Sequence, residues 1–189
     1  AEWRGTRTPA LVFGGRRAKT APLVYQSFSW EHGVYVGSAM ASETTAAATG
    51  AVGVVRRDPM AMRPFCGYNM GDYFGHWLAM GKKLGDKAPK IFNVNWFRTN
   101  EEGKFIWPGF GDNLRVLEWI IKRSFGKANA EECELGYMPC ACDINLEGAD
   151  IDEKTVDGLL EIDRDLWKKE AADIREYYAR LGEKVPKEL

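Results

Sequence analysis

Aromatic side chains crowd into one stretch of this 189-residue chain, between Asn95 and Asn113. Five of its nineteen residues are aromatic, and these are Trp96, Phe97, Phe105, Trp107 and Phe110. Glycines and asparagines interrupt the stretch, which is typical of a loop, and aromatic rings on a loop offer flat surfaces for a planar ligand. Local composition alone nevertheless favours a hairpin of core aromatics, so both interpretations stand at this point.

A second candidate site is the run Gly14-Gly15-Arg16-Arg17, directly after a predicted strand. Paired glycines allow tight backbone geometry, and arginine presents forked donors that suit phosphate or carboxylate groups. Taken by itself, such a run is more typical of a glycine turn with solvated charges.

Residues 42–53 form a third unusual segment, in which alanine, glycine and threonine dominate. Side chains this small bury little surface, so the segment predicts a surface loop or a lid that moves easily. The end of an alanine-rich helix followed by a linker is the alternative, and the residues favour neither interpretation.

These candidates depend on the strands and helices that position them, and hydrophobic periodicity predicts those elements. We expect strands at residues 10–13, 22–28, 33–37 and 90–94. We expect helices at residues 68–83, 114–123 and 163–181, the first of them ended by Gly81 and Gly85. Between Gly126 and the last helix the chain is expected to be polar and irregular.

The predicted helix at 114–123 follows the aromatic stretch directly, with Asp112 or Asn113 as its N-cap. Backbone N–H groups at a helix start have no partner within the helix. We therefore expect these groups to face the aromatic loop, where they could bind a base carbonyl or a phosphate.

Charge and composition exclude several classes of protein. The formal net charge of −1 argues against electrostatic binding of nucleic acid or of an anionic membrane. No apolar run approaches the roughly 20 residues that span a bilayer, and the first residues do not have the form of a signal peptide. We expect a cytoplasmic protein that contacts neither nucleic acid nor membrane.

The chain has four cysteines, Cys66, Cys133, Cys140 and Cys142. Their wide spacing and the lack of a secretion signal favour reduced thiols. Cys140-Ala141-Cys142 is not the Cys-x-x-Cys of redox motifs or zinc knuckles, and only His32 and His76 could complete a metal site. We expect no zinc site, and we expect His32 to be a structural histidine.

The arginine run, the small-residue segment and the aromatic stretch together suit a nucleotide, with arginine on phosphate and aromatic rings around the base. A Gly-x-x-x-x-Gly-Lys-Ser/Thr phosphate loop is absent from the sequence. The chain closely resembles the C-terminal part of GTP-dependent phosphoenolpyruvate carboxykinase, from about residue 11 to the end and more weakly after Gly126. The matching motifs are Phe13-Gly-Gly-Arg-Arg17, Pro22-Leu-Val-Tyr25, Trp30-Glu-His-Gly-Val34, Ser42-Glu-Thr-Thr-Ala-Ala-Ala48, Asp58-Pro-Met-Ala-Met-Arg-Pro-Phe65, Gly67-Tyr-Asn69, Val94-Asn-Trp-Phe-Arg98 and Trp107-Pro-Gly-Phe-Gly-Asp-Asn113.

The resemblance implies an α/β fold, the later portion of the carboxykinase C-terminal nucleotide-binding domain, with a mixed sheet and flanking helices. Residues 1–189 would be a partial GTP-binding domain, with an Ω-loop lid at about 44–54 and a guanine-binding loop at about 95–113. The implied enzyme is a carboxy-lyase of gluconeogenesis and anaplerosis. It converts oxaloacetate and GTP to phosphoenolpyruvate, carbon dioxide and GDP.

The resemblance also implies roles for individual residues. The implied nucleotide-binding residues are Arg16, Trp96, Phe97, Phe105, Phe110, Gly111, Asp112 and Asn113. Phe97 and Phe110 would stack on the two faces of guanine, and Phe105 would lie at its edge. Arg16 would contact the phosphates, and the turn at 110–113 would contact the guanine edge.

The implied lid would close over bound substrates, exclude water and protect the enolate intermediate from protonation. Its residues are Glu43, Thr44, Thr45, Ala46, Ala47, Ala48, Thr49 and Gly50.

The residues that the resemblance implies for the chemistry itself have no counterpart in this chain. They are the family's phosphate loop, its reactive cysteine, its oxaloacetate-binding arginine and its ligands for Mn²⁺ (and Mg²⁺). We therefore expect no catalytic residue and no metal ligand here, and no activity of the chain alone. Both ends of the sequence look cut, which indicates part of a larger enzyme, monomeric by resemblance. The alternative is a non-catalytic, aromatic-rich ligand-binding module.

Overall fold

The computed structural model of this chain describes residues 5–45 and 51–189. Its strands are β1 (Ala10–Gly14), β2 (Val24–Gln26), β3 (Ala41–Glu43), β4 (Val55–Arg57), β5 (Lys90–Val94), β6 (Glu131–Cys133) and β7 (Gly136–Met138). Its α-helices are α1 (Trp30–Ser38), α2 (Met70–Leu84), α3 (Asn113–Ser124), α4 (Glu153–Leu160) and α5 (Arg164–Leu181). Short 3-10 turns occur at Pro59–Ala61, Gly85–Lys87, Phe110–Asp112 and Ala141–Asp143.

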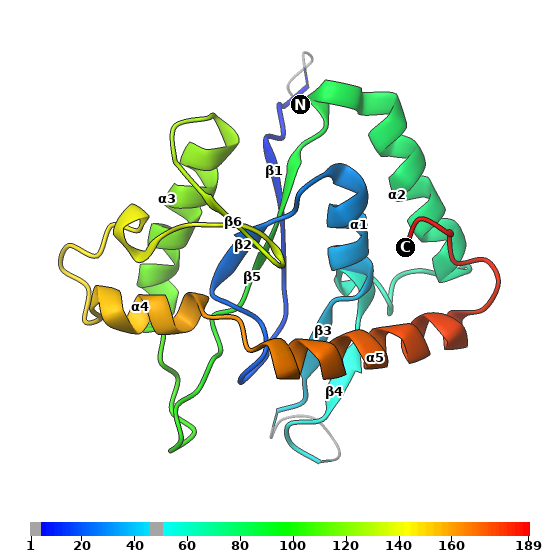
Figure 1. Cartoon of the computed structure of the whole chain (residues 1–189). Helices are drawn as coiled ribbons and strands as arrows, with labels where there is room; N and C mark the ends of the chain where they lie inside the picture. The colour runs from blue at the N-terminus through cyan, green and yellow to red at the C-terminus, as the bar shows by residue number, and fades with distance from the viewer. Residues whose placement is uncertain (1–4, 46–50) are drawn as a thin grey trace.

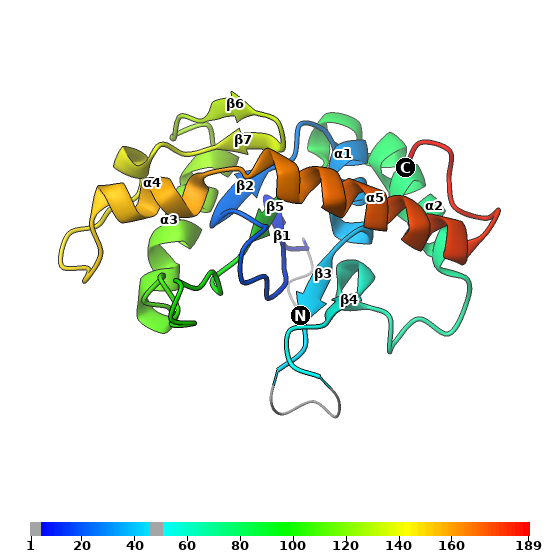
Figure 2. The same cartoon turned by 60° about the horizontal axis from the view of Figure 1, so that its bottom comes forward.

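Five strands form a mixed sheet in the order β1-β5-β2-β7-β6 (Figure 1). β1 and β5 run parallel, with Leu11 opposite Ile91, and the remaining neighbours are antiparallel. β3 and β4 make a separate two-stranded hairpin. This hairpin projects away from the larger sheet (Figure 2).

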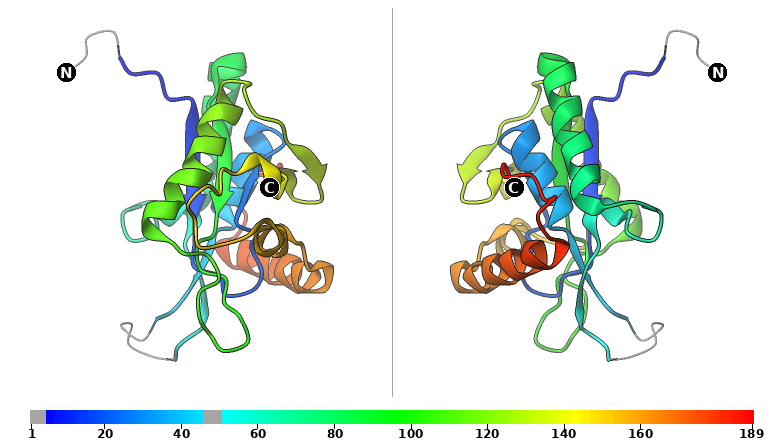
Figure 3. Two further views of the ribbon diagram at one scale, coloured as in Figure 1. Left: turned by 90° about the vertical axis from the view of Figure 1, so that its left-hand side faces the viewer. Right: turned by 90° about the vertical axis from the view of Figure 1, so that its right-hand side faces the viewer.

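Helices cover both faces of the larger sheet, and β5 shows how. Successive residues of a strand point to opposite faces. Ile91 packs against α1, where a Cβ at Gly33 would lie 2.5 Å from its side chain. The ring of Phe92 lies 5.9 Å from that of Trp119 on α3, across the other face. Figure 3 shows α1 and α5 on one side of the sheet, and most of the apolar core surrounds the opposite face.

Most of the predicted elements are confirmed, but the strand predicted at 33–37 is wrong. Those residues lie in α1, whose N-cap Ser29 accepts a hydrogen bond from the backbone N–H of His32. Gly33 and Gly37 are four residues apart, so they lie on one helical face, and their missing side chains admit Ile91 and Phe13. Close packing of a small-residue face thus overrides the strand propensity of the intervening Val and Tyr residues.

The segment after Gly126 is also more ordered than predicted. It contains the hairpin β6–β7 and the helix α4. Asp152 caps α4 by accepting a hydrogen bond of 2.8 Å from the N–H of Thr155, and Val156 and Leu159 enter the core. An aspartate followed by apolar residues at helical spacing is a sequence signal for a helix, so α4 could have been predicted.

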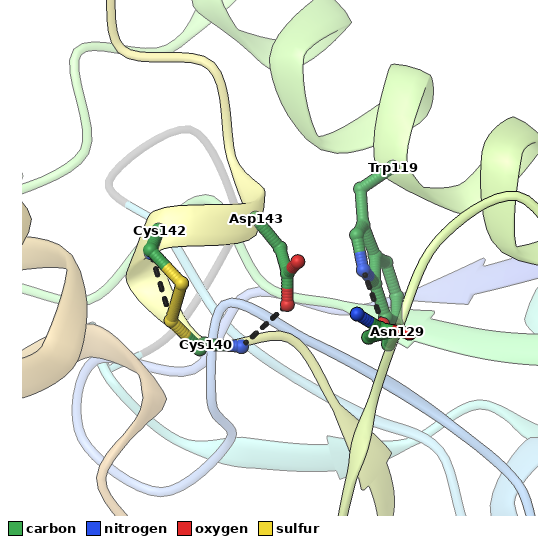
Figure 4. The surroundings of a disulfide bond; sticks show 5 residues. All are labelled: Trp119, Asn129, Cys140, Cys142 and Asp143. Atoms are coloured by element: carbon green, nitrogen blue, oxygen red, sulfur yellow. Dashed lines mark hydrogen bonds between the residues drawn. A yellow bond between two sulfur atoms is a disulfide. The ribbon is translucent and has the colours of Figure 1, made fainter.

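The expectation of four reduced thiols is wrong for two of them. Cys140 and Cys142 are joined by a disulfide, whereas Cys66 and Cys133 are free. Figure 4 shows the turn that holds the pair, with the Asp143 carboxylate accepting from the backbone N–H of Cys140 at 3.2 Å. The turn brings two cysteines separated by one residue to a Cα–Cα distance of 5.2 Å. That distance lies within the range of disulfides, although the two-residue spacing does not indicate one in sequence.

No helix among the described residues is both long enough and apolar enough to cross a bilayer.

Gly81 was expected to end α2, but it lies inside the helix, and Gly85 caps it. A Cβ at Gly81 would lie 2.1 Å from the Trp30 ring, whose Nε1 donates to the Trp77 carbonyl at 2.7 Å. The glycine therefore allows α1 and α2 to pack closely.

We predict that Gly81→Ala lowers the free energy of unfolding by about 1–3 kcal/mol, because the methyl group overpacks against Trp30. Gly75→Ala, in the same helix, is the matched control. Its nearest neighbour would be a Pro186 atom at 4.0 Å, so helix propensity should make it neutral or stabilising by about 0.5–1 kcal/mol. Urea denaturation of both variants measures the difference, and equal midpoints would contradict the packing argument.

Candidate nucleotide site

The Gly14–Arg17 loop leaves the end of β1 and runs against the start of the β3–β4 hairpin. A Cβ at Gly15 would lie 2.1 Å from the carbonyl oxygen of Ala41, so only glycine fits this approach. Arg16 donates its backbone N–H to the Ser42 hydroxyl at 3.1 Å and accepts from the N–H of Glu43 at 2.8 Å. These contacts fix the loop's backbone.

Asn95 joins this loop to the aromatic stretch. Its Nδ2 donates to the carbonyls of Arg17 and Ala21, both at 2.8 Å. Its Oδ1 accepts from the backbone N–H groups of Arg17 at 3.3 Å and Phe97 at 3.2 Å. The side chain is 1% exposed, so all four bonds form in a buried setting. Asn95 thereby holds the arginine loop and the aromatic loop in one arrangement.

Beyond Asn95 the aromatic stretch forms a hairpin. Thr99 pairs with Phe105, and the N–H of Ile106 donates to the carbonyl of Arg98 at 2.9 Å. The Arg98 guanidinium donates to the carbonyl of Leu159 at 3.2 Å, at the end of α4. The hairpin projects from the same end of the molecule as β3 and β4 (Figures 1 and 3).

Arg16 and Phe97 face one cleft of about 610 Å³, which the Gly14–Arg17 loop, β3 and the start of the lid segment line together. The Arg16 guanidinium carbon lies 4.5 Å from the centre of the Phe97 ring, a cation–π contact. The Nε of Arg16 is buried and has no hydrogen-bond partner among the described residues. The structure thus presents an arginine donor at the cleft, stacked on an aromatic ring.

A second cavity of about 430 Å³ adjoins the first, and the two share Trp96 and Phe97. The rings of Phe97 and Phe105 meet edge to face with their centres 5.7 Å apart. Phe110 also lines this cavity, although its side chain is 98% exposed. The structure therefore brings the four aromatic site residues predicted from the sequence to one cavity.

The composition of the aromatic stretch allowed two interpretations, a loop that binds a planar ligand and a hairpin of core aromatics. The structure contains features of both. Trp107 is 2% exposed and belongs to the apolar core, where its Nε1 donates to the Asn113 side chain at 2.8 Å. Phe105 and Phe110 are exposed, so they contribute little to that core. Trp107 is thus structural, Trp96 packs partly against the same core, and Phe105 and Phe110 are exposed at the cavity.

The turn at 110–113 leads into α3, but not with the side-chain cap that was predicted. Asp112 occupies the N-cap position, but its carboxylate accepts from no backbone N–H of α3. It pairs instead with the side chain of Arg115 at 2.7 Å. The Asn113 side chain accepts from Trp107 instead. α3 therefore begins without a side-chain cap, and the backbone N–H groups of Asp112 and Asn113 donate instead to carbonyls of the preceding turn. The expectation that the N–H groups at this helix start are free is wrong for Asn113.

Part of the predicted lid lies within the described residues. Glu43 ends β3, and its carboxylate accepts from the N–H of Ala18 at 3.0 Å. Thr44 closes the base of the segment, because its backbone N–H donates to the Val54 carbonyl at 2.9 Å and its hydroxyl to the Ala51 carbonyl at 2.5 Å. Thr44 and Thr45 line the cleft. The lid predictions at Ala46, Ala47, Ala48, Thr49 and Gly50 lie outside the described residues.

His32 has the structural role that was expected. Its Nδ1 accepts from the backbone N–H of Phe28 at 3.1 Å, and burial lowers the pKa of its imidazole.

A comparison with protein families decides where the chain belongs. The family described as the phosphoenolpyruvate carboxykinase C-terminal P-loop domain matches residues 1–189. The chain belongs to this family.

Individual carboxykinases agree with this assignment. Proteins named phosphoenolpyruvate carboxykinase (GTP) are 50% identical in Anaeromyxobacter sp. (strain K), 51% in Thermoplasma volcanium and 51% in Neocallimastix frontalis. Each similarity covers 98% of this chain and 31% of the relative. The chain thus spans about a third of the length of the carboxykinases that it matches.

The carboxykinase domain also contains a cluster of buried ion pairs that was not predicted from the sequence. Glu170 of α5 pairs with Arg17 at 2.6 Å and with Arg57 of β4 at 2.7 Å. Arg57 also pairs with Asp173. Burial alone would raise the pKa of Glu170, but the two arginines hold it below its usual value. One sequence signal for this cluster was available. Glu170 lies four positions before the buried Ile174, so the two share the apolar face of the last helix, where an acidic residue needs a partner.

We predict that Glu170→Gln lowers the free energy of unfolding of this carboxykinase domain by about 3–5 kcal/mol at neutral pH, because Arg17 and Arg57 lose their buried anion. The control Glu134→Gln removes an exposed partner of Arg164 and should leave stability unchanged.

The pH dependence of unfolding gives a second measurement on the same pair. A carboxyl whose pKa is lowered by folding stabilises above its unfolded pKa, and this stabilisation is lost as pH falls through the folded pKa. The gap between wild type and Glu170→Gln should therefore be widest near neutral pH and shrink on acidification. A gap that stays constant into the acid range would contradict this role for the Glu170 charge.

Proposed function

We propose that this chain supplies the guanine-nucleotide site of a GTP-dependent phosphoenolpyruvate carboxykinase. In the proposed reaction, oxaloacetate and GTP give phosphoenolpyruvate, carbon dioxide and GDP. The base would enter the aromatic cavity, and the phosphates would lie in the adjoining cleft. Family membership and the names of the relatives support this proposal.

The observation that carries the proposal is Phe110. Its side chain is 98% exposed and its φ of 34° lies in the left-handed region, which disfavours residues other than glycine. Neither burial nor backbone preference explains a phenylalanine here, and such residues cluster at ligand sites. A planar base between Phe110 and Phe97 would explain both features.

Arg16 would bind the nucleotide phosphates. Its side chain lines the cleft, and the forked donors of a guanidinium match the oxygens of a phosphate. The contact with Phe97 positions the guanidinium at the junction of the two cavities. This adjacency suits one ligand that carries a base and a phosphate chain.

Selectivity for guanine would come from hydrogen bonds at the base edge, since stacking does not distinguish purines. In the turn at 110–113, the N–H groups of Asp112 and Asn113 already donate to carbonyls of the same turn. The N–H groups of Phe110 and Gly111 would therefore be the donors to the carbonyl oxygen that guanine has and adenine lacks. Adenine would leave these donors unpaired, at a cost of about 1–3 kcal/mol each.

Residues 44–54 would act as the lid. The bonds of Thr44 to Ala51 and Val54 hold the two ends of the segment together at the edge of the cleft. Closure would exclude water from an enolate formed in the reaction and so prevent its protonation to pyruvate.

The family resemblance also implies Mn²⁺, but the described residues do not fit it. Among residues 5–45 and 51–189, the one group of three potential ligands that lie close together is Cys140, Cys142 and Asp143. Its two sulfurs are bonded to each other, and so are not available as thiolates. Binding of a metal, like the chemical steps of the proposed reaction, would need residues outside this chain.

We predict that the chain binds GDP and IDP in preference to ADP, with quenching of the fluorescence of Trp96, which lines both cavities. An oligosaccharide serves as the probe for a different class, a sugar-binding aromatic module. Quenching by the sugar alone, or equal affinity for ADP and GDP, would contradict the proposal.

Phe110→Ala should weaken GDP binding by about 1–3 kcal/mol, the usual value of one base–aromatic stack. It should leave the free energy of unfolding unchanged, because the side chain is almost fully exposed. Phe125→Ala, half-exposed at the opposite end of α3, is the matched control for loss of a surface phenylalanine. GDP affinity that is unchanged in Phe110→Ala would remove the principal support for the site.

A further inference from the structure

A cavity rich in arginine, lined by β4, the segment after it and the C-terminal half of α5, lies apart from the aromatic pocket. Its volume is about 390 Å³. Four arginines and one acidic residue line it, and they are Arg56, Arg57, Arg63, Arg180 and Asp173. The whole chain carries a formal charge of −1, so this cavity concentrates positive charge on a nearly neutral protein.

Two of the five charged groups already neutralise each other. Arg57 pairs with Asp173 and with the buried Glu170. The other three arginines, at positions 56, 63 and 180, form no ion pair with a carboxylate among the described residues. One donor of Arg63 reaches the Arg57 carbonyl at 3.4 Å. The three guanidinium groups that line this cavity therefore keep most of their donors available for an anion.

Tyr177 provides a second, independent observation. Its side chain lines the same cavity and is 94% buried, since 6% of its surface is exposed. Its hydroxyl has no hydrogen-bond partner among the described residues, although buried hydroxyls are normally paired. Burial raises the pKa of Tyr177 to about 12, so the hydroxyl keeps its proton and remains a donor. The cavity thus has a buried donor as well as exposed cations.

We propose that this cavity binds a small oxyanion that carries two or more negative charges. Arg63, in the segment after β4, and Arg180, on α5, would bind it, and the Tyr177 hydroxyl would donate to it. Arginine forks match phosphate and carboxylate oxygens equally, so the geometry fixes the charge and the oxygen chemistry of the ligand. The cavity shares Arg56 with the cleft of the proposed nucleotide site, but the inference does not depend on that site.

Arg56 lines both this cavity and the nucleotide cleft, so a substitution of Arg56 would not distinguish the two sites. Arg63 and Arg180 line only the arginine cavity, so they report on it selectively. Arg16 lines only the cleft, and Arg16→Gln removes the stacked arginine that would otherwise attract the same anions there.

The test is calorimetric titration of the Arg16→Gln chain with inorganic pyrophosphate and, separately, with citrate. Adding Arg63→Gln and Arg180→Gln to this chain should weaken binding of the preferred anion at least tenfold. Arg175→Gln, an exposed arginine of α5 outside the cavity, should leave the affinity unchanged. The two probes distinguish a phosphate ligand from a carboxylate ligand.

Tyr177→Phe gives a readout that net charge does not affect. It should weaken binding of the anion severalfold, without lowering stability, because the hydroxyl it removes has no partner. Absence of binding by both anions to the Arg16→Gln chain would overturn the proposal. An equal loss of affinity in the Arg175→Gln control would also overturn it, since it would show attraction by net charge alone.

Discussion

The proposed nucleotide site depends on one buried amide side chain, that of Asn95. Its four hydrogen bonds use both donors of Nδ2 and both lone pairs of Oδ1, so its hydrogen-bonding capacity is full. The groups that it contacts belong to two loops far apart in sequence, one around Arg17 and one at Phe97. Since β1 and β5 are parallel neighbours, both loops leave the same edge of the sheet. The sheet brings the loops near each other, and Asn95 fixes their relative position.

The surroundings of Asn95 differ in burial, from buried ion pairs on one side to exposed aromatic side chains on the other. Behind the loop, the pairs of Glu170 with Arg17 and Arg57 join α5, the arginine loop and β4 through buried charges. In front of it, the aromatic cavity ends at the exposed Phe105 and Phe110. A site whose side chains are held before a ligand arrives loses less entropy on binding. The carboxykinase domain thus combines an arginine loop with a fixed backbone, our proposed phosphate site, with aromatic side chains that are exposed in the absence of a ligand.

The sequence predicted the parts of this site that depend on local chemistry. Glycines before Arg16, aromatics around Phe97 and the helix after Asn113 all carry strong local signals, and the resemblance to carboxykinases joined them into one site. It did not predict contacts that arise only after folding. The pairing of Glu170 with Arg17 spans 153 positions. The strand prediction at 33–37 failed because the packing of Gly33 against Ile91 outweighs β propensity. The disulfide of Cys140 and Cys142 was missed because it depends on a turn rather than on a recognised spacing.

The claim that Asn95 holds the two loops together has a direct test in amide hydrogen exchange of the Asn95→Asp variant. Aspartate keeps the acceptors but loses both donors to Arg17 and Ala21. Asn100→Asp is the control, because Asn100 uses its side chain only to accept, from Glu102 and Lys104. We expect Asn95→Asp to speed exchange in both segments, 15–21 and 96–99, and Asn100→Asp to leave both unchanged. Faster exchange in only one segment, or in neither, would contradict the account.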